Sequence, residues 1–125
     1  MKIKVTKEVK ELQGSIIEKV ATPFGNSAHI NVGKKHTGKF LSIIEPENPE
    51  YAWVLSKEDL KKTIALCNKV LDTEDNKLTQ VKRNRVNDLK DRRFEVGSLY
   101  TVIGLLEKVK GENPLLKLIK KTYNL

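Results

Sequence analysis

Short apolar runs alternate with polar residues in the first part of the chain, and this spacing predicts half-buried β-strands. Glycine and proline separate the runs, as turn residues do. The candidate strands lie at residues 3–5, 15–20, 28–32, 40–44 and 51–55. The pattern therefore predicts a small antiparallel β unit that closes at residue 55.

After Leu55 the apolar positions recur at the spacing of amphipathic helices. Ser56 followed by Asp59 has the pattern of a helix N-cap with an acid three residues on. Residues 72–76 break the pattern, and Gly111 and Asn113-Pro114 have the pattern of a helix end followed by a new helix start. The expected helices lie at residues 57–71, 78–89, 95–109 and 114–121.

Together these patterns predict an α+β fold with two domains, a β domain at residues 1–55 and a helical bundle at residues 56–125. No apolar run is long enough to span a bilayer, and the N-terminus lacks the apolar core of a secretion signal. We therefore expect a cytoplasmic protein that does not enter the membrane.

The chain has one cysteine, Cys67, which falls among the apolar positions of a predicted helix. An intramolecular disulfide is impossible, and a buried structural thiol is expected rather than a nucleophile. His29 and His36 have no cysteine or carboxylate nearby at the spacing of metal ligands. We expect no metal and no cofactor.

The net charge is +8, from 24 Lys and Arg against 16 Asp and Glu, and every arginine lies between Arg83 and Arg93. A charge of this size favours nucleic acid, an acidic membrane surface or an acidic partner. Lysine-rich solvated helices are the alternative explanation.

One stretch, from Thr22 to Lys39, carries more specific information. A Gly-Asn-Ser turn at residues 25–27 precedes an alternating strand, a basic turn at residues 33–38 and another apolar run. Over about residues 10–58 this resembles the AbrB/MazE-like class of swapped-hairpin DNA-binding proteins, and in particular its short archaeal, transposon-encoded members.

The resemblance implies a homodimer whose hairpins interleave and present a face to double-stranded DNA. A short β segment cannot cover its own apolar face, and pairing with a second copy covers it and removes its open edges. Two departures limit what is carried over. Gly33 stands where the class has proline, and Asn31 stands where antitoxin members often have arginine.

Lysines of the basic turn are expected to contact phosphates, and polar residues of the preceding strand are expected to contact base edges or phosphates. The alternatives are a purely structural Gly-Asn-Ser turn and a solvated rim of lysines. For the arginine segment, a phosphate-binding helix competes with a solvated, salt-bridged helix. The candidate DNA-binding residues are Asn26, His29, Asn31, Lys34, Lys35, His36, Lys39, Arg83 and Arg85.

The sequence holds no glycine-rich phosphate loop, no paired-histidine motif and no Ser/His/Asp cluster, so we expect no enzyme. The expected function is that of a homodimeric DNA-binding regulator or accessory protein of a mobile element. Two alternatives remain. One is an interaction module, antitoxin-like or bound to a transposase, whose C-terminal helices hold a protein partner. The other is a structural nucleoprotein or virion component.

Overall fold

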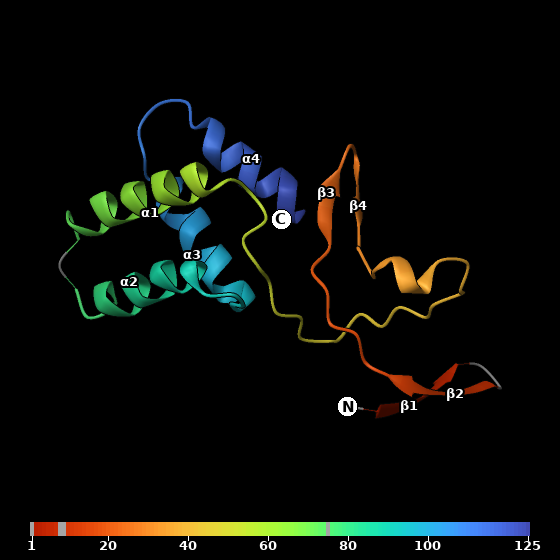
Figure 1. Cartoon of the computed structure of the whole chain (residues 1–125). Helices are drawn as coiled ribbons and strands as arrows, with labels where there is room; N and C mark the ends of the chain where they lie inside the picture. The colour runs from red at the N-terminus through yellow and green to blue at the C-terminus, as the bar shows by residue number, and fades with distance from the viewer. Residues whose placement is uncertain (1, 8–9, 75) are drawn as a thin grey trace. The chain divides into compact units, whose positions relative to one another are not determined.

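The computed structural model describes residues 2–7, 10–74 and 76–125. Antiparallel strands near the N-terminus are followed by four α-helices, so the predicted α+β class is confirmed (Figure 1). The contacts divide the chain into a β unit, which ends at Ser42, and a helical unit, which runs from Ile43 to Leu125. None of the helices in the described ranges has the length and apolar character needed to cross a membrane.

The β unit contains two antiparallel hairpins, each a separate two-stranded sheet. In the first hairpin, β1 (Lys2–Lys7) pairs with β2 (Lys10–Ser15), and Lys2 lies opposite Ser15. In the second, β3 (Thr22–Phe24) pairs with β4 (Ser27–His29). The strand predicted around residues 3–5 is confirmed.

Two predicted strands differ in position from the observed ones. The strand expected at residues 15–20 lies at residues 10–15, and the one expected at 28–32 ends at His29. Residues 39–46 form no strand, although residues 40–44 have the spacing of one. The alternation of apolar and polar residues shows which side chains could be buried together. A strand also requires a neighbouring strand whose edge makes hydrogen bonds with it.

The segment predicted to close the β unit, Tyr51–Leu55, packs on the core of the helical unit instead. Tyr51 N donates to Phe94 O at 2.8 Å, and Phe94 N donates to Tyr51 O at 2.9 Å, which makes one isolated antiparallel bridge. The domain ranges 1–55 and 56–125 stay a prediction, which expression of the two parts separately would test.

The helical unit follows the sequence pattern closely. Ser56 caps the first helix, because its Oγ accepts a hydrogen bond from Asp59 N at 3.1 Å. Asn113 caps the last helix in the same way, with its Oδ1 accepting from Leu116 N at 3.2 Å and Pro114 at the first helical position. The helices are α1 (Lys57–Leu71), α2 (Thr79–Asn87), α3 (Val96–Leu106) and α4 (Pro114–Tyr123).

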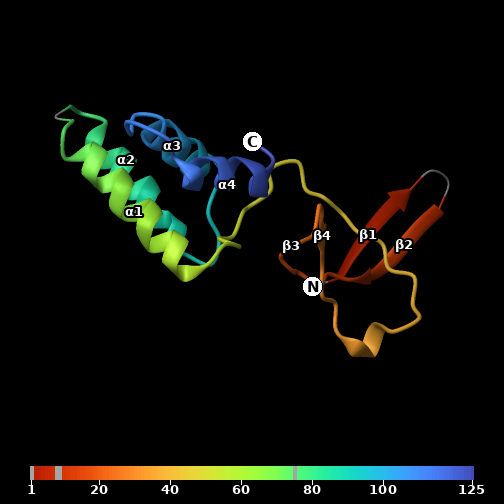
Figure 2. The same cartoon turned by 90° about the horizontal axis from the view of Figure 1, so that it is seen from above.

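Two short 3₁₀ turns complete the elements, η1 (Lys34–His36) in the β unit and η2 (Asp88–Lys90) after α2. The helix expected over residues 78–89 is therefore shorter than predicted and ends in a tighter turn. In the helical unit, α1 and α2 lie side by side, and α1, α2 and α4 each pack against α3 (Figures 1 and 2).

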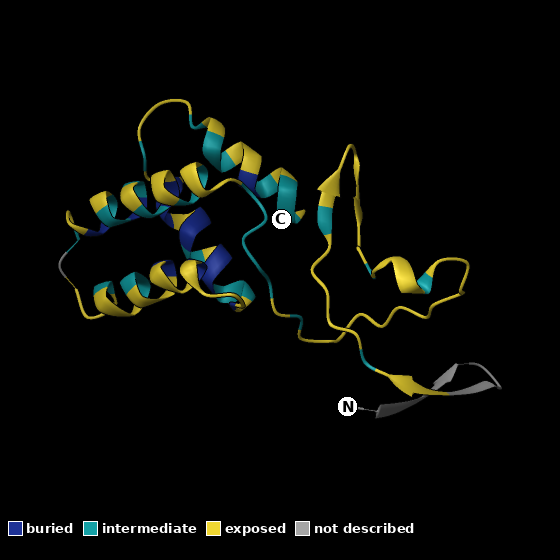
Figure 3. Ribbon diagram, in the orientation of Figure 1, coloured by how far each residue is buried: buried dark blue, intermediate teal, exposed yellow. Residues whose placement is uncertain are grey.

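Helix α3 forms the centre of the core. Its buried side chains include Leu99, Val102 and Leu106, none of which is measurably exposed (Figure 3). Burying a leucine or valine side chain contributes about 1.5–3 kcal/mol, so this helix anchors the unit. Cys67 on α1 is also fully buried, as predicted, and burial raises the pKa of its thiol to about 12.

Candidate nucleic-acid interface

The Gly-Asn-Ser motif forms the tip of the β3–β4 hairpin. Phe24 lies opposite Ser27, which leaves Gly25 and Asn26 as a two-residue loop. Gly25 has a φ of 60°, and a positive φ at the first loop position is the type II′ geometry that glycine adopts without strain. Ser27 Oγ donates to Phe24 O at 3.2 Å. The motif thus has the structural turn role, and Asn26 is exposed at the tip.

His29 lies on β4 of the same hairpin, opposite Thr22. Its ring meets the ring of Phe24 edge to face, with centroids 5.2 Å apart and an interplanar angle of 82°. Both residues are exposed, and Phe24 keeps 69% of its surface accessible. The contact between the two rings leaves an aromatic surface open on the hairpin.

Asn31 connects the hairpin to the basic turn. Its Oδ1 accepts a hydrogen bond from Gly33 N at 3.0 Å, and Gly33 has a φ of 94°. This is an Asx turn, which uses the side-chain oxygen of Asn31 to bend the chain. The side-chain NH₂ of Asn31 takes no part in this hydrogen bond.

The basic turn itself is compact. Thr37 donates to Lys34 O through both its backbone N, at 3.0 Å, and its Oγ1, at 2.6 Å. Lys39 N donates to His36 O at 3.0 Å. These bonds hold Lys34, Lys35 and Lys39 close together on one short stretch of backbone, and all three are exposed. The turn therefore concentrates three cations at a fixed place on the β unit.

His36 differs from its neighbours because it is half-buried. Among the described residues, its Nε2 is the one buried side-chain polar atom without a hydrogen-bond partner. The imidazole therefore packs within the turn more than it projects from it. Its predicted contact with DNA stays a prediction, as do those of the other candidate residues.

The charge around the turn has one sign. From Lys19 to Ile44 the chain holds four lysines and no aspartate or glutamate. Without nearby carboxylates to neutralise them, these ammonium groups add to one local positive potential.

The two candidate arginines belong to the helical unit and have different surroundings. Arg83 Nη1 donates to Asn68 Oδ1 at 2.9 Å, and Arg83 Nη2 donates to Asp72 Oδ1 at 3.1 Å, so this side chain ties α2 to α1. Arg85 is exposed, and its guanidinium lies over Gly97, where an added Cβ would be 2.0 Å from Arg85 Nη1. The guanidinium of Arg83 is therefore occupied by bonds between the two helices, whereas Arg85 remains accessible to solvent.

Leu118 and Ile119 are neighbouring apolar residues of α4, but Leu118 is 39% exposed and lines a groove, whereas Ile119 is fully buried. Successive helical residues point about 100° apart, so Ile119 occupies the inward position and Leu118 the flank. Leu66 lines the same groove and was not singled out from the sequence. The spacing of Leu66 and Leu118 from the core positions of their own helices is the sequence signal that could have placed them beside the core, at the groove.

A further property of the β unit concerns its apolar side chains. From Gln13 to Ser42 no residue is buried. Phe40 is fully exposed, and the segment around it makes no ladder. The large apolar residues exposed in this range are Ile17, Val20, Phe24, Ile30, Phe40 and Leu41.

Comparison with known proteins gives one match. Residues 1–47, which include both hairpins and the basic turn, match the family described as "Putative transposon-encoded protein (DUF2080)". No curated protein matches the chain. No solved structure matches it. The family match covers less than half of the chain, and it fits the link to mobile elements expected from the sequence.

Proposed function

We propose that this protein is a non-enzymatic, homodimeric DNA-binding protein that serves a mobile element as a regulator or accessory factor. The observation that carries the proposal is the character of the β unit. Its described side chains from Gln13 onward form no buried core, while its turn gathers Lys34, Lys35 and Lys39 at an exposed site.

The exposed apolar residues support dimerisation. Six large apolar side chains are exposed within the thirty residues from Gln13 to Ser42, including Phe24 at 69% and Phe40 at 107%. Isolated two-stranded hairpins are marginal in water, and large apolar side chains left exposed in such number are typical of an interaction site. A second copy that interleaves its strands with the first would cover these side chains. The resemblance to swapped-hairpin proteins supports this arrangement.

The positive charge of the basic turn supports DNA binding. A dimer carries two basic turns and so six exposed turn lysines. Lysine contacts to phosphate supply affinity without sequence information, whereas the exposed side-chain amide of Asn26 and the side-chain NH₂ of Asn31 would contact base edges. Two-fold symmetry of the protein matches a two-fold symmetric operator.

The deciding experiment compares two variants that have the same net charge. In one, Lys34, Lys35 and Lys39 are replaced by glutamine. In the control, three exposed lysines of the helical unit, Lys57, Lys77 and Lys110, are replaced instead. Binding to a random duplex is measured by fluorescence anisotropy over a range of salt concentrations.

We expect the turn variant to bind more weakly and with a smaller salt dependence. Each lost phosphate contact lowers the slope of log K against log salt by about 0.9, so the loss of six contacts lowers it by about 5. The control should retain most of the slope. Equal slopes for the two variants would show that the basic turn does not hold DNA.

Dimerisation needs its own measurement, by sedimentation equilibrium of the whole chain. Phe40→Asp should shift the protein toward the monomer, because it places a charge in the proposed apolar interface. Leu78→Asp is the matched control, since Leu78 is 60% exposed and lies in the helical unit. A wild-type protein that stays monomeric at all accessible concentrations would refute the dimer.

A further inference from the structure

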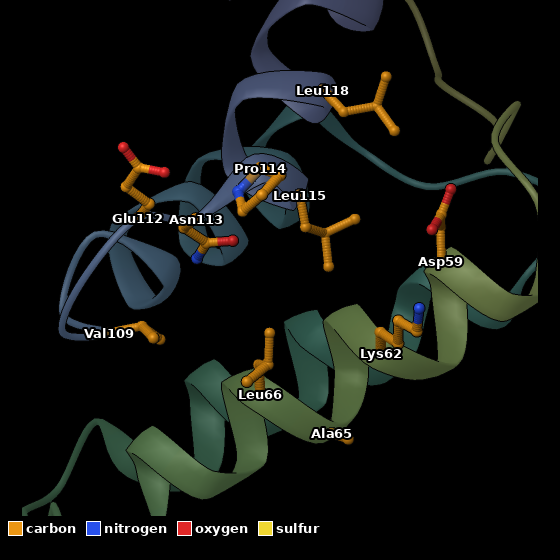
Figure 4. A pocket seen from close by; sticks show the side chains of 10 residues that line it. All are labelled: Asp59, Lys62, Ala65, Leu66, Val109, Glu112, Asn113, Pro114, Leu115 and Leu118. Carbon is orange, nitrogen blue, oxygen red and sulfur yellow. The ribbon is translucent and has the colours of Figure 1, made fainter.

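Helices α1 and α4 diverge on the outside of the helical unit and leave an open groove between them (Figure 4). The groove has a volume of about 660 Å³. Its middle is apolar, formed by Leu66 of α1 and by Pro114 and Leu115 of α4, with Leu118 near one end. Leu118 keeps 39% of its surface exposed, Pro114 is exposed, and Leu66 and Leu115 are half-buried.

The polar residues of the lining do not converge on the centre. Asn113 caps α4 with its Oδ1, and its Nδ2 donates to Leu106 O at 3.4 Å, so both ends of its amide are engaged by the backbone. Asp59 and Lys62 lie at one end of the groove and Glu112 at the other (Figure 4). A cleft that binds a small polar ligand has several polar groups that converge on it, and this groove has none that do. The apolar face of a helix needs no such groups in order to bind.

The two walls of the groove carry lysines. Lys69 follows Lys62 by seven residues and so lies on the same side of α1. On α4, Lys117 and Lys121 each lie three residues beyond the lining residues Pro114 and Leu118. These three further lysines are exposed. Together with Lys62, these lysines outnumber the two carboxylates at the ends of the groove, Asp59 and Glu112. The net positive charge beside the apolar floor is complementary to an amphipathic helix that has acidic flanks.

A second copy of this chain does not supply that complement. Helix α1 has four lysines against two acids, α2 and α4 have only basic charges, and α3 has none of either sign. Any of these helices placed in the groove would set lysine against lysine or bring no carboxylate. The groove therefore favours a different protein.

We propose that the α1–α4 groove is a docking site for an amphipathic helix of a partner protein, with apolar residues on one face and Asp or Glu along both flanks. The site would give the helical unit a binding role separate from DNA binding by the β unit. It does not depend on the proposed DNA-binding function.

The test uses three labelled synthetic helices of about fifteen residues, which is four turns. The first has leucines at the spacing i, i+3, i+4 and i+7 with glutamates on the flanks. The second replaces the glutamates by lysines, and the third replaces the leucines by glutamines. Binding to the whole protein is measured by fluorescence anisotropy at low and high salt.

We expect the acidic leucine helix to bind at least about tenfold more tightly than either of the others, and to weaken as salt rises. Leu118→Glu should weaken it at least about tenfold, because it sets an unpaired carboxylate in the apolar floor. Leu78→Glu is the matched control and should bind like the wild type, since Leu78 is exposed outside the groove.

A second variant, Ala65→Glu, tests the opposite wall of the groove, on α1, at an exposed position in case Leu118→Glu disturbs folding, and it should also weaken binding of the acidic helix. The glutamine variant of Lys34, Lys35 and Lys39 should bind the acidic helix normally, and Leu118→Glu should bind DNA normally. The proposal is overturned by any of four results. These are no binding of the acidic helix, equal binding of the acidic and basic helices, loss of self-association in Leu118→Glu, and displacement of the helix by duplex DNA.

Discussion

The hydroxyl of Tyr123, in the last turn of α4, donates to the carbonyl oxygen of Ala52 at 2.7 Å across 71 residues of sequence. The hydroxyl oxygen of Tyr123 in turn accepts a hydrogen bond from Val54 N at 3.0 Å. The Tyr123 ring also lies against Tyr51 and Trp53, with centroids 6.1 and 6.3 Å away. The Tyr123 side chain thus bonds the backbone groups of Ala52 and Val54, which in a sheet would bond a neighbouring strand. It also holds the segment before α1 against the core.

Tyr123→Phe should destabilise the helical unit by about 1–3 kcal/mol, because Ala52 O and Val54 N both lose their partner in a half-buried setting. Urea unfolding followed by circular dichroism measures the change. Tyr100→Phe is the matched control, since Tyr100 is 58% exposed, and it should stay within about 0.5 kcal/mol of the wild type. Equal effects of the two variants would contradict the assigned role.

The same tyrosine predicts a loss of stability at alkaline pH. Burial raises the pKa of Tyr123 from 10.0 to about 12, and the hydrogen bond from Val54 only partly offsets this. The unfolded chain therefore ionises first. The contribution of Tyr123 is complete below pH 10.0 and is lost as pH rises toward about 12. Melting temperatures across this range should fall less steeply for Tyr123→Phe than for the wild type.

The environment of Glu74 predicts a loss of stability at acid pH. Its carboxylate bonds Lys108 and also Lys82, at 3.4 Å, and these contacts lower its pKa, the hydrogen bond from Lys108 most of all. Its contribution is present above the ordinary pKa of glutamate and is lost as pH falls through the lowered value. Glu74→Gln should flatten this part of the profile of melting temperature against pH. Glu112→Gln, an exposed glutamate, is the control, and flattening of both profiles alike would argue against the pair.

Substitutions of Arg83 and Arg85 should affect different properties, stability for Arg83 and DNA binding for Arg85. Arg83→Gln removes the two bonds to Asn68 and Asp72 and should lower stability by about 1 kcal/mol, because Asp72 is largely exposed and its ion pair contributes little. Arg85→Gln should leave stability unchanged, and it lowers DNA affinity if the arginine segment contacts phosphate. Thermal melts and duplex binding on both variants test this, and a stable Arg83→Gln with weakened DNA binding would reverse the assignment.

Cys67 should resist alkylation in the folded protein. Burial raises its thiol pKa from 9.0 to about 12, which lowers the thiolate fraction about a thousandfold at pH near 8, in addition to blocking access. Ser42→Cys adds an exposed thiol as an internal control. Mass spectrometry during iodoacetamide labelling should show one fast and one slow modification in this variant. Two equally fast modifications would mean that Cys67 is accessible.

The helices could be predicted from sequence because their starts are local. Ser56 and Asn113 each bond a backbone N–H three residues on, so the capping residue and the helix lie in the same short window. The strand positions could not be predicted as well. The run at residues 40–44 has the right alternation, but whether it pairs depends on an edge supplied by another segment, which a local pattern does not encode.

The candidate site shows the same division. The Gly-Asn-Ser turn and the cluster of turn lysines are local, and the turn at Gly25 lies where the motif predicts it. The partners of Arg83 are fifteen and eleven residues away on another helix, so the charge pattern of its own helix did not reveal them. The groove depends on the angle between α1 and α4, which no run of residues in either helix specifies.

The bridge between Tyr51 and Phe94 has a kinetic consequence. The two residues are 43 positions apart, and α1 and α2 lie between them in the sequence. Contacts that close long loops carry a larger entropic cost and form late, whereas helical turns form at once. The residues before α1 should therefore dock last during folding and detach first during local opening. Hydrogen exchange should detect this as weaker protection of the Tyr51 and Phe94 amides than of those in the middle of α3.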